Sequence, residues 1–464
     1  MTPRGEAIAS EEYRRVTDDV LSAMGPSGPG YRAGLTVTAA MILLGAVAWG
    51  FQLIYGMGLA GYTHPIMWAV YITSFVWWIG IAHSGTLISA ILFLLRAPFR
   101  AAFSRSAEAM TVIAITTAAG FPVIHLGRAW RAYWVFPYPN ERQIWITFPS
   151  PLILDIFAVS TYLIISMLFF WFGLVPDLAA VRDRSAGWKR TIYGVLSLGW
   201  EGKDRQWKHY RMAYALLAGL ATPLVVSVHS VVSWDFALSI LPGWHNTLFA
   251  PYFVAGAIFS GLAMVLTLLV PMRSLLRLEQ YLTISRFEQL AKLALFMSLI
   301  VTYSYAVEYF TIWYQRDPTE QANLLFKVRG DFAPLFWIMT VCNSIAPLAF
   351  FWRSIRRNLL ALFVISILIN IGMWLERFVI IAGSLARDHV PYSWAPDGYH
   401  ISLVEAGIFI GSLGWFLFWF LLFAKRLPVL PISELKHDML KEHREVQAMR
   451  IGEVGAARGG ERGV

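Results

Sequence analysis

Cysteine and charged residues are both scarce in this chain of 464 residues. Its one cysteine, Cys342, excludes a framework of disulfide bonds and an iron–sulfur cluster held by this chain, because such a cluster needs about four thiolates. Charged residues make up 14% of the sequence and hydrophobic residues 57%, with a mean hydropathy of +0.55. This composition indicates an integral membrane protein rather than a water-soluble domain. Redox centres are expected only in partner proteins.

The first 30 residues lack the apolar core of about 7 to 15 residues that a cleavable signal peptide requires. Acidic and basic side chains are mixed there instead, which predicts a short amphipathic helix ended by the Gly- and Pro-rich segment 25–30. Such a helix suits a contact with the membrane surface or with another subunit, and a solvated tail is an equal alternative.

Ten long apolar segments dominate the rest of the chain. A helix rises about 1.5 Å per residue, so about 20 residues cross a hydrocarbon layer roughly 30 Å thick. Each segment reaches that length, which predicts an all-α integral membrane protein with ten transmembrane helices. The segments are 33–59, 68–95, 107–127, 150–175, 212–240, 250–272, 288–314, 332–352, 358–385 and 400–424.

Positive charge is distributed unevenly between the connections of these segments. Thirty of the 38 Lys and Arg residues fall in the two tails and in every second connection. Cationic segments are retained in the cytoplasm, so both termini are expected to be cytoplasmic. This bias, together with attraction to anionic lipid, accounts for the net charge of +9, and we expect the lipid bilayer and no nucleic acid as a partner.

An internal repeat relates the first eight segments. Glu108 opens the third segment and Glu288 the seventh, and the Ser-Pro-Leu of 150–152 is matched by the Ala-Pro-Leu of 333–335. Four spans return the chain to its starting side, so the copies share one orientation, which predicts two parallel four-helix bundles plus two extra helices. The expected boundaries are 1–30 for the N-terminal tail, 31–176 for the first bundle, 177–209 for a cytoplasmic loop, 210–352 for the second bundle, 353–425 for the extra helices and 426–464 for the C-terminal tail.

Ionisable residues within apolar segments are costly in lipid and usually mark a pathway or a site. His125 and Asp155 both fall towards the outer side of the membrane, and only the first bundle combines a His with an Asp. We expect these two residues to be functional, and the alternative is an ion pair in which Arg128 holds Asp155. Asp235, close to the end of its segment, is expected to be a helix-end residue. Candidates for a proton path are His83, Ser84, Thr86, His229, Glu308, Glu376 and Arg377.

His83 and His229 form the one histidine pair near the middle of the membrane. A haem b needs two axial ligands, but a di-haem four-helix cytochrome normally supplies four such histidines. A role in proton transfer and a hydrogen-bonded core histidine are the alternatives. We expect neither haem nor metal on this chain.

The connection that follows His125 is dense in arginine and aromatic residues. Arg131, Tyr133 and Trp134 are of the types that anchor protein interfaces, which predicts a docking site for a partner. The alternative is the belt of aromatic residues that membrane proteins carry at the lipid headgroups.

Several of these features together resemble the polysulfide reductase membrane subunit (NrfD-like) family. They are the repeated four-helix bundles without cofactor ligands, the segment 125–128, the helix start 149–155 and the ten-span length. The resemblance covers residues 30–425 and is greatest to the ten-span family member of alternative complex III, ActC. It implies a subunit of the bacterial cytoplasmic membrane that oxidises quinol or menaquinol. The implied partners are a periplasmic iron–sulfur protein, multihaem and monohaem cytochrome c proteins and a second NrfD-like membrane subunit.

The resemblance also implies a quinol pocket in the first bundle, with His125 and Asp155 as polar contacts and Arg128 as an organising residue. Quinol oxidation releases two protons, so each hydroxyl needs an acceptor within about 2.6 to 3.2 Å. A neutral imidazole and a buried carboxylate are suitable acceptors. The residues expected to surround the ring and its isoprenoid tail are Phe121, Trp130, Phe148 and Ile156.

Two other classes stay open at the level of sequence. A transporter or proton channel would be favoured by discontinuous helices at equivalent positions of both copies, but Pro122 and Pro223 do not correspond under the repeat. A passive anchor for electron-transfer proteins would bind no quinone. The proton-path candidates leave room for proton translocation coupled to the reaction.

Overall fold

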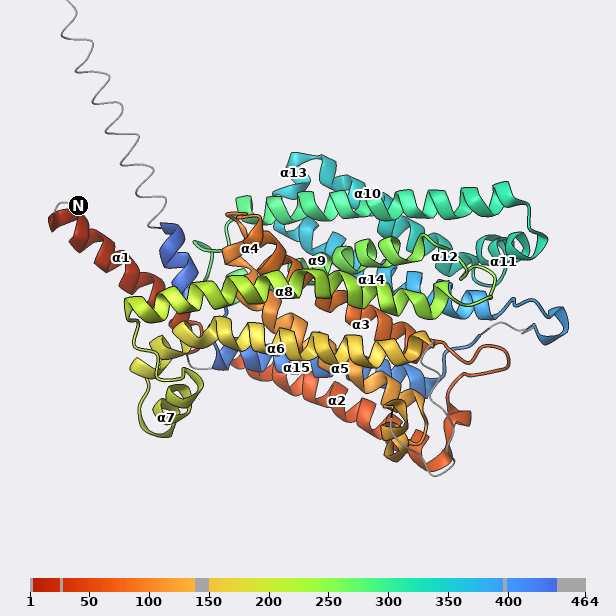
Figure 1. The fold of residues 1–464 in the computed structure, drawn as a ribbon, viewed down its shortest axis with the longest axis horizontal. Coiled ribbons are helices and arrows are strands. Elements are labelled where there is room, and N and C mark those ends of the chain that lie inside the picture. The colour runs from red at the N-terminus through yellow and green to blue at the C-terminus, as the bar shows by residue number, and fades with distance from the viewer. Residues whose placement is uncertain (1–2, 26–27, 138–149, 395–398, 440–464) are drawn as a thin grey trace, which may run out of the picture.

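The computed structural model is helical throughout the residues that it describes, which are 3–25, 28–137, 150–394 and 399–439, and no β-strand occurs among them. Within these ranges ten helices are long and apolar enough to cross a membrane, which confirms the prediction of an all-α protein with ten spans. They run along the long axis of the molecule (Figure 1).

The spanning helices agree with the predicted segments, and two of them contain irregular turns. They are α2 (Pro29–Tyr55), α3 (Val70–Thr86) continued by η2 (Leu87–Ile91) and α4 (Leu92–Leu94), α5 (Ser104–His125), α6 (Pro151–Asp183), α8 (Asp204–Ala237), α9 (Phe249–Leu275), α10 (Ile284–Gln315), α12 (Ala333–Thr340) continued by η5 (Val341–Ile345) and η6 (Ala346–Phe351), α14 (Leu359–Leu385) and α15 (Leu403–Arg426). The connecting elements are α1 (Pro3–Ser22), η1 (Met57–Leu59), η3 (Arg100–Ala102), η4 (Ala129–Val135), α7 (Gly187–Leu196), α11 (Pro318–Arg329), α13 (Arg353–Arg356) and η7 (Pro391–Ser393).

The connections gather at two opposite ends of the molecule. Helices α1, α7 and α13 lie towards one end, here called the α1 end, and α11 lies at the other, the α11 end (Figure 1). Lys425, near the close of α15, donates a hydrogen bond to the carbonyl of Ala23 at 2.9 Å, so the segments after α1 and at the end of α15 meet at the α1 end. That the α1 end faces the cytoplasm stays a prediction from the charge distribution.

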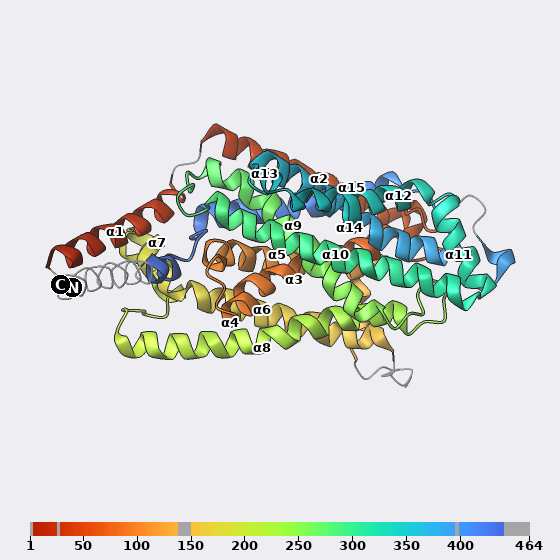
Figure 2. The same cartoon turned by 90° about the horizontal axis from the view of Figure 1, so that it is seen from above.

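Two four-helix bundles form the body of the molecule. The first consists of α3, α5, α6 and α8, and the second of α9, α10, α12 and α14. The bundles meet mainly where α9 packs against α3 and α8. The expected ranges 31–176 and 210–352 group the spans differently and stay a prediction. By their contacts α2 and α15 pair with each other outside these two bundles, and Figure 2 shows α2 and α8 along opposite long edges.

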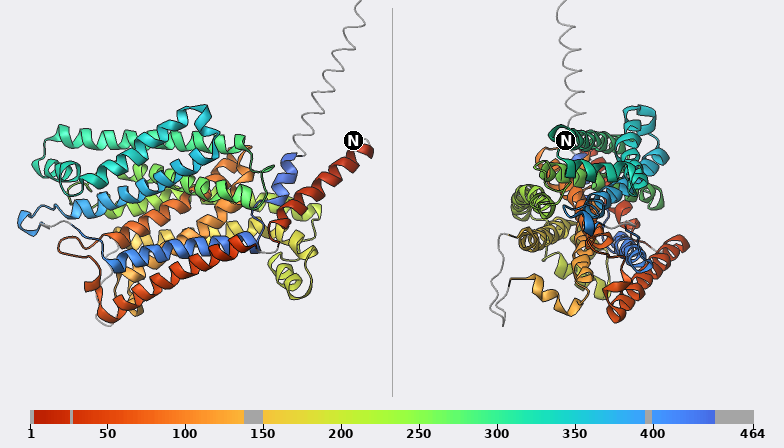
Figure 3. Two further views of the ribbon diagram at one scale, coloured as in Figure 1. Left: turned by 180° about the vertical axis from the view of Figure 1, so that it is seen from behind. Right: turned by 90° about the vertical axis from the view of Figure 1, so that its right-hand side faces the viewer.

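Helix α2 lies outside the first bundle because it packs closely on α15. A Cβ atom added to Gly45 would lie 2.7 Å from the Cα of Gly411, and one added to Gly414 would lie 2.5 Å from the Cβ of Met41. Small residues let two helix backbones approach closely, which is a main source of helix association in lipid. Figure 3 shows the two helices side by side along one edge of the molecule.

Helices α6 and α8 are longer than a membrane requires. They contain 33 and 34 residues, so both project beyond a layer that about 20 residues can cross. Most of the expected loop 177–209 is therefore helical, made of the end of α6, the separate helix α7 and the start of α8.

Buried ion pairs neutralise the charges that both bundles carry towards the α1 end. In the first bundle, Arg105 donates to Glu108 at 2.8 Å and to Asp177 at 3.0 Å. In the second, Arg356 lies 3.4 Å from Glu288. Glu108 and Glu288 are the positions that the repeat relates, so both copies use an acidic residue in the same structural way.

Candidate functional site

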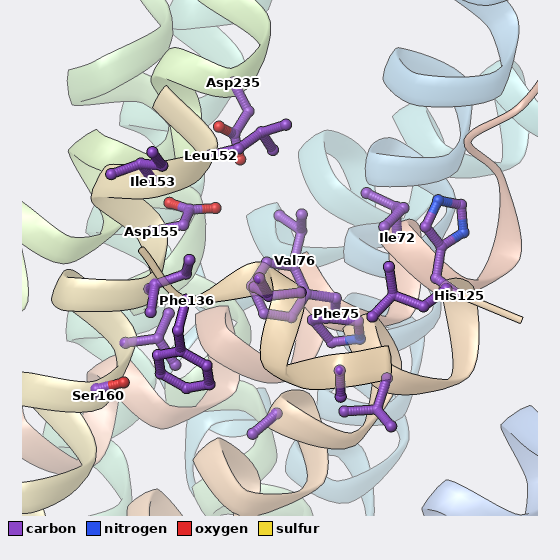
Figure 4. Close-up of a pocket in the computed structure, with 18 of the residues that line it drawn as sticks. Ile72, Phe75, Val76, His125, Phe136, Leu152, Ile153, Asp155, Ser160 and Asp235 are labelled. Atoms are coloured by element: carbon purple, nitrogen blue, oxygen red, sulfur yellow. The ribbon is translucent and has the colours of Figure 1, made fainter. Parts of the chain in front are cut away.

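A cavity of about 480 Å³ lies in the first bundle, towards the α11 end. It is enclosed by α3, α5, η4 and α6, and α8 contributes one residue (Figure 4). Ala119 and Leu126 of the α5 segment and Leu152 and Ser160 of α6 line the cavity and are also exposed, so it opens at the lipid-facing surface between these helices. Three polar residues, His125, Asp155 and Asp235, also line it, and the rest of the lining is apolar: Trp68, Ile72, Phe75, Val76, Pro122, Val123, Ala132, Val135, Phe136, Ile153, Ile156 and Val159.

His125 is the last residue of α5 and stands on one side of the cavity. Its Nδ1 atom lies 3.2 Å from the hydroxyl of Tyr62, and the two rings meet edge to face with centroids 5.6 Å apart. The helix ends here because Gly127 adopts a φ of 70°, a conformation that favours glycine and closes helices. The position of His125 is therefore set by a helix terminus and by a tyrosine outside the cavity.

Asp155 stands on the other side, in the second turn of α6. Pro151 begins this helix, where the missing N–H group costs nothing, so α6 starts one turn before Asp155. The carboxyl group of Asp155 faces that of Asp235, which comes from the last turn of α8. The Oδ1 atoms of both groups are buried and have no hydrogen-bond partner among the described residues.

Sequence reasoning assigns Asp235 to a helix end and misses its place in the cavity. Asp235 does lie two residues before the end of α8, but α6 and α8 pack together as antiparallel neighbours. The end of α8 therefore meets the start of α6, where Asp155 lies. The sequence does contain a signal for the pair, because Asp155 and Asp235 each lie five positions from the end of a predicted segment, at 150 and at 240, on one face of the membrane.

The cavity thus has proton-accepting groups on two sides and apolar walls between them. Figure 4 shows His125 on one side, Asp155 and Asp235 on the other, and Phe75 and Val76 between the two sides. Such a site suits a flat apolar ring with a polar group at each end. An imidazole and a carboxyl pair could each take a proton from such a ligand.

The other residues predicted for this site have different environments. Ile156 lines the cavity. Phe121 is buried behind it, with its ring centroid 6.5 Å from that of Tyr71. Arg128 and Trp130 are exposed and do not line the cavity, and Phe148 lies outside the described residues.

The η4 segment forms a wall of the cavity and an exposed surface at once. Three residues from 132–136 line the cavity. Trp130, Tyr133 and Trp134 are instead 64%, 56% and 50% exposed, and the guanidinium of Arg131 lies 4.2 Å from the ring centroid of Trp134. We call these four residues the η4 surface. It lies directly outside the cavity because the same short segment supplies both faces.

His83 of α3 and His229 of α8 contact each other inside the first bundle. Their ring centroids are 4.5 Å apart, and the Nδ1 atom of His83 lies 2.7 Å from the carbonyl of Ile79. Rings in contact leave no space for a porphyrin between them, so this arrangement is not a bis-histidine haem site. Among the described residues, no group of three or more His, Cys, Asp or Glu could hold a metal ion.

Thr86 and Ser84, both candidates for the proton path, differ in their contacts. The hydroxyl of Thr86 lies 2.9 Å from that of Tyr162, whose ring lies 5.2 Å from His83. Ser84 donates to the carbonyl of Ile81 in its own helix. Thr86 thus continues the buried polar group of the two histidines through Tyr162.

In the second bundle, side chains fill the position that the repeat relates to the cavity. The space between α9, α10, α11, α12 and α14 has a volume of only about 20 Å³. Tyr305 and Glu308, the neighbourhood that the repeat relates to His125, both line it. Tyr305, Tyr309 and Phe336 occupy it, with ring centroids 6.3 and 5.6 Å apart in that order. Glu308 also lines a larger space of about 510 Å³ between the ends of α8 and α10 and the starts of α9 and α11.

Glu376 and Arg377 are fully buried on α14 and contact each other. Glu376 also accepts hydrogen bonds from Tyr305 and, at 3.2 Å, from Asn343. The guanidinium of Arg377 lies 5.0 Å from the ring centroid of Phe253. These two proton-path candidates therefore belong to the second bundle together with Glu308, away from the cavity.

Lys327 of α11 is buried beside this group, outside the spanning helices. Its Nζ atom donates to the hydroxyl of Ser384 at 2.7 Å. Burial lowers the pKa of Lys327 to about 8, although the nearby Glu308 and Glu320 act in the opposite direction. Lys327 thus titrates only slightly above neutral pH.

Two comparisons with known proteins bear on this geometry. A model of the family described as polysulphide reductase, NrfD, matches residues 58–387, which is more than half of the chain. A protein of Halobacterium salinarum (strain ATCC 700922 / JCM 11081 / NRC-1), named as a putative membrane subunit of dimethyl sulfoxide reductase, is 28% identical over 384 residues, which cover 80% of this chain and 80% of that protein. The range 58–387 contains both four-helix bundles and the complete lining of the cavity.

Proposed function

Because the chain belongs to the polysulphide reductase NrfD family and is a multi-pass membrane subunit of a redox enzyme complex, we propose that it binds and oxidises quinol in the cavity between His125 and the Asp155–Asp235 pair. The observation that carries this proposal is the cavity itself, which is apolar, opens towards lipid and has proton acceptors on two sides. A quinol is a flat ring dissolved in the bilayer, with a hydroxyl at each end. Its shape and its chemistry match those features.

The proposed reaction removes two electrons and two protons from the quinol. The Nε2 atom of His125 takes the proton of one hydroxyl, and the carboxyl pair takes the proton of the other. Two carboxyl groups in contact within an apolar site carry one negative charge at less cost than two, so the pair acts as a single base. The two electrons leave to the iron–sulfur partner.

We assign the docking of that partner to the η4 surface. Electron transfer needs a short path, and this surface is separated from the cavity only by the thickness of one segment. In the order of alternative complex III, the electrons continue from the periplasmic iron–sulfur protein to c-type haems of cytochromes, and a second NrfD-like protein forms the rest of the membrane part. The α1 end then faces the cytoplasm of a bacterial cell.

The name of the Halobacterium relative supports a second assignment of the electron acceptor. In a dimethyl sulfoxide reductase-like complex, the same quinol site would supply electrons to a reductase subunit rather than to cytochromes. The chemistry within this chain is the same in both cases. Mass spectrometry of proteins that copurify with the chain distinguishes c-type haem peptides from a reductase subunit.

A transporter or channel has less support from the helices. The irregular turns η2 and η5 interrupt the second and eighth spans, which the repeat does not relate. The paired discontinuous helices typical of transporters are therefore absent from the described residues.

The proposal is tested by filling the cavity from one helix. Val159→Trp places an indole in the cavity, whereas Phe157→Trp changes a 52% exposed residue on the outer face of the same helix. We expect purified complex with Val159→Trp to lose both bound quinone and quinol oxidation, and the Phe157→Trp complex to retain both. Equal quinone content and activity in the two variants would show that quinol does not react in this cavity. The chain would then be better interpreted as a passive anchor.

A further inference from the structure

A tyrosine outside the cavity holds the ring of His125. The hydroxyl of Tyr62 lies 3.2 Å from Nδ1, and the two rings are nearly perpendicular, at 89°. Tyr62 belongs to the connection between α2 and α3 and does not line the cavity. Nδ1 of the imidazole is thus hydrogen-bonded to Tyr62, on the side away from the cavity. Nε2 is the nitrogen that stays available to a ligand.

The position of Tyr62 is fixed by α15. The preceding backbone N–H, that of Gly61, donates to Oε2 of Glu405 at 3.0 Å. Glu405 is fully buried and also accepts from the hydroxyl of Tyr399. A Cβ atom at Gly61 would lie 2.2 Å from the carbonyl oxygen of His400, so the chain touches this segment where only glycine has room.

A second contact fixes Tyr62 from the side of α3. Its ring packs edge to face on that of Tyr71, with centroids 5.8 Å apart. Tyr71 donates to the side chain of Gln52 on α2, and Gln52 donates to the carbonyl of Ile124 at 3.1 Å. The backbone directly before His125 and the ring of Tyr62 are therefore connected through Tyr71 and Gln52, by two hydrogen bonds and one ring contact.

Tyr62 acts as a neutral phenol in this place. Burial, and next the charge of Glu405, raises the pKa of the Tyr62 hydroxyl well above its ordinary value. The titratable groups around it are His125, Tyr71, Tyr399 and Glu405. Its contact with His125 is thus a hydrogen bond made by a neutral phenol and not an ion pair with a phenolate.

The direction of this hydrogen bond decides whether His125 can accept a proton from the cavity. A neutral imidazole carries hydrogen on one nitrogen only, and the other nitrogen accepts. When Nδ1 donates to the oxygen of Tyr62, Nε2 is the acceptor and can take a hydroxyl proton. When Nδ1 accepts from Tyr62, Nε2 carries hydrogen and cannot. A productive site therefore needs the first arrangement.

We propose that Tyr62 is a positioning residue for His125, holding the imidazole in the orientation in which Nε2 faces the cavity and accepts a quinol proton when Nδ1 is the donor to Tyr62. This rests on the proposed quinol oxidation. As quinol is oxidised to quinone, one hydroxyl proton passes to Nε2 and gives an imidazolium whose Nδ1–H stays bonded to Tyr62. The second proton passes to the carboxyl pair, and both electrons pass to the iron–sulfur partner. Tyr62 exchanges neither atoms nor electrons with the substrate.

Tyr62→Phe tests the proposal in the purified complex, because it keeps the ring contacts and removes only the hydroxyl. We expect KM and bound quinone to change less than about threefold. We expect kcat to fall roughly 10- to 100-fold, the range found for partners that orient metal-bound histidines. The acidic limb of the kcat–pH profile should also shift, because the stability of the imidazolium changes. Tyr303→Phe, at a 67% exposed position of α10 outside every site described above, is the matched control and should leave all three quantities unchanged.

The outcomes separate this inference from the proposed function. A normal kcat and pH profile in Tyr62→Phe, beside an inactive His125→Ala, would overturn the role of Tyr62 alone. Normal turnover in His125→Ala would overturn the proposed quinol chemistry itself. Should Tyr62→Phe fail to assemble, replacement of Tyr62 alone by 3,5-difluorotyrosine keeps the hydroxyl but weakens it as an acceptor. A lower kcat at constant KM then supports the proposal, and an unchanged kcat contradicts it.

Discussion

Asp155 and Asp235 face each other from the start of α6 and the end of α8, and together they form one side of the first-bundle cavity. They lie 80 positions apart in the sequence, but the antiparallel packing of the two helices places them at one depth. Neither carboxyl group has an arginine or lysine among the residues that line the cavity. The pair is therefore available for proton exchange with a ligand.

Replacing either aspartate should impair turnover, because the two carboxyl groups act as one base. We expect Asp155→Asn to lower kcat about 100-fold and Asp235→Asn about 10-fold or more, with the double variant little worse than Asp155→Asn. Quinol oxidation by purified complex measures the effect. Asp331→Asn, an exposed acidic residue between α11 and α12, is the control and should be normal. Additive losses in the double variant would show that the two groups act separately.

His125→Ala should lower quinol oxidation about 100-fold or more, the loss typical of a general base, while assembly and partner cofactors stay intact. Steady-state kinetics and the visible spectrum of the complex provide both measurements. His245→Ala removes an exposed histidine near the ends of α8 and α9 and should have no effect. Near-normal turnover in His125→Ala would redirect the search to Glu308.

The η4 surface should be required for binding the iron–sulfur partner. Simultaneous replacement of Arg131, Tyr133 and Trp134 by Ala should release that partner, since anchors of these types contribute about 2 kcal/mol or more each. Quantitative mass spectrometry after affinity purification measures what remains bound. Replacing Trp313, Tyr314 and Arg316 at the end of α10 removes the same three residue types from another exposed site and is the control. Unchanged copurification would identify the η4 surface as an aromatic belt.

His83→Ala tests whether the buried histidine pair conducts protons. Because the pair lies apart from the cavity lining, we expect electron transfer to stay within about twofold of normal, while protons released per electron decrease in proteoliposomes. A pH-sensitive dye and a quinol assay measure the two rates on one sample. His209→Ala, an exposed histidine near the start of α8, is the control. If acidification per electron is unchanged, α3 carries no proton path.

Lys327 should make stability depend on pH in a defined window. Its pKa is about 8 in the folded protein, against an ordinary value of 10.5, so between these values the unfolded chain binds the proton that the folded chain has lost. The free energy of unfolding therefore rises with pH across this window. Below pH 8 Lys327 is charged in both states, so the full cost of burying its charge is present. Thermal unfolding in detergent should show a shallower rise from pH 8 to 9.5 for Lys327→Met. The exposed Lys189→Met should follow the original curve, and parallel curves for all three proteins would contradict the assignment.

Hydropathy and charge are sufficient to predict ten spans, because the length of an apolar run is a property of the sequence alone. Hydropathy and charge do not predict which helix packs against which. The prediction groups α2 with the first bundle, whereas the closeness of Gly45 to Gly411 joins it to α15. Hydropathy records that a face is apolar and does not record which other apolar face it meets.

The candidate site is predictable as a pair of residues and not as a cavity. His125 and Asp155 stand out because ionisable residues are rare in apolar segments. Asp235 and Tyr62 do not, since one belongs to a helix end and the other to a connection, where polar residues are ordinary. Their importance arises only when α8 and the α2–α3 connection are packed against α6 and α5.

The pairing of α2 with α15 has a consequence for the order of assembly during synthesis. Among the ten described spans, α2 leaves the ribosome first and its partner leaves last. It therefore stays in lipid without its partner while eight further spans are inserted. Its surface is compatible with lipid, since only 22% of its most apolar 18-residue window is buried inside the folded chain. Its glycine face stays open until α15 arrives. A chain that stops before α15 would therefore contain both bundles and an α2 helix whose glycine face has no partner.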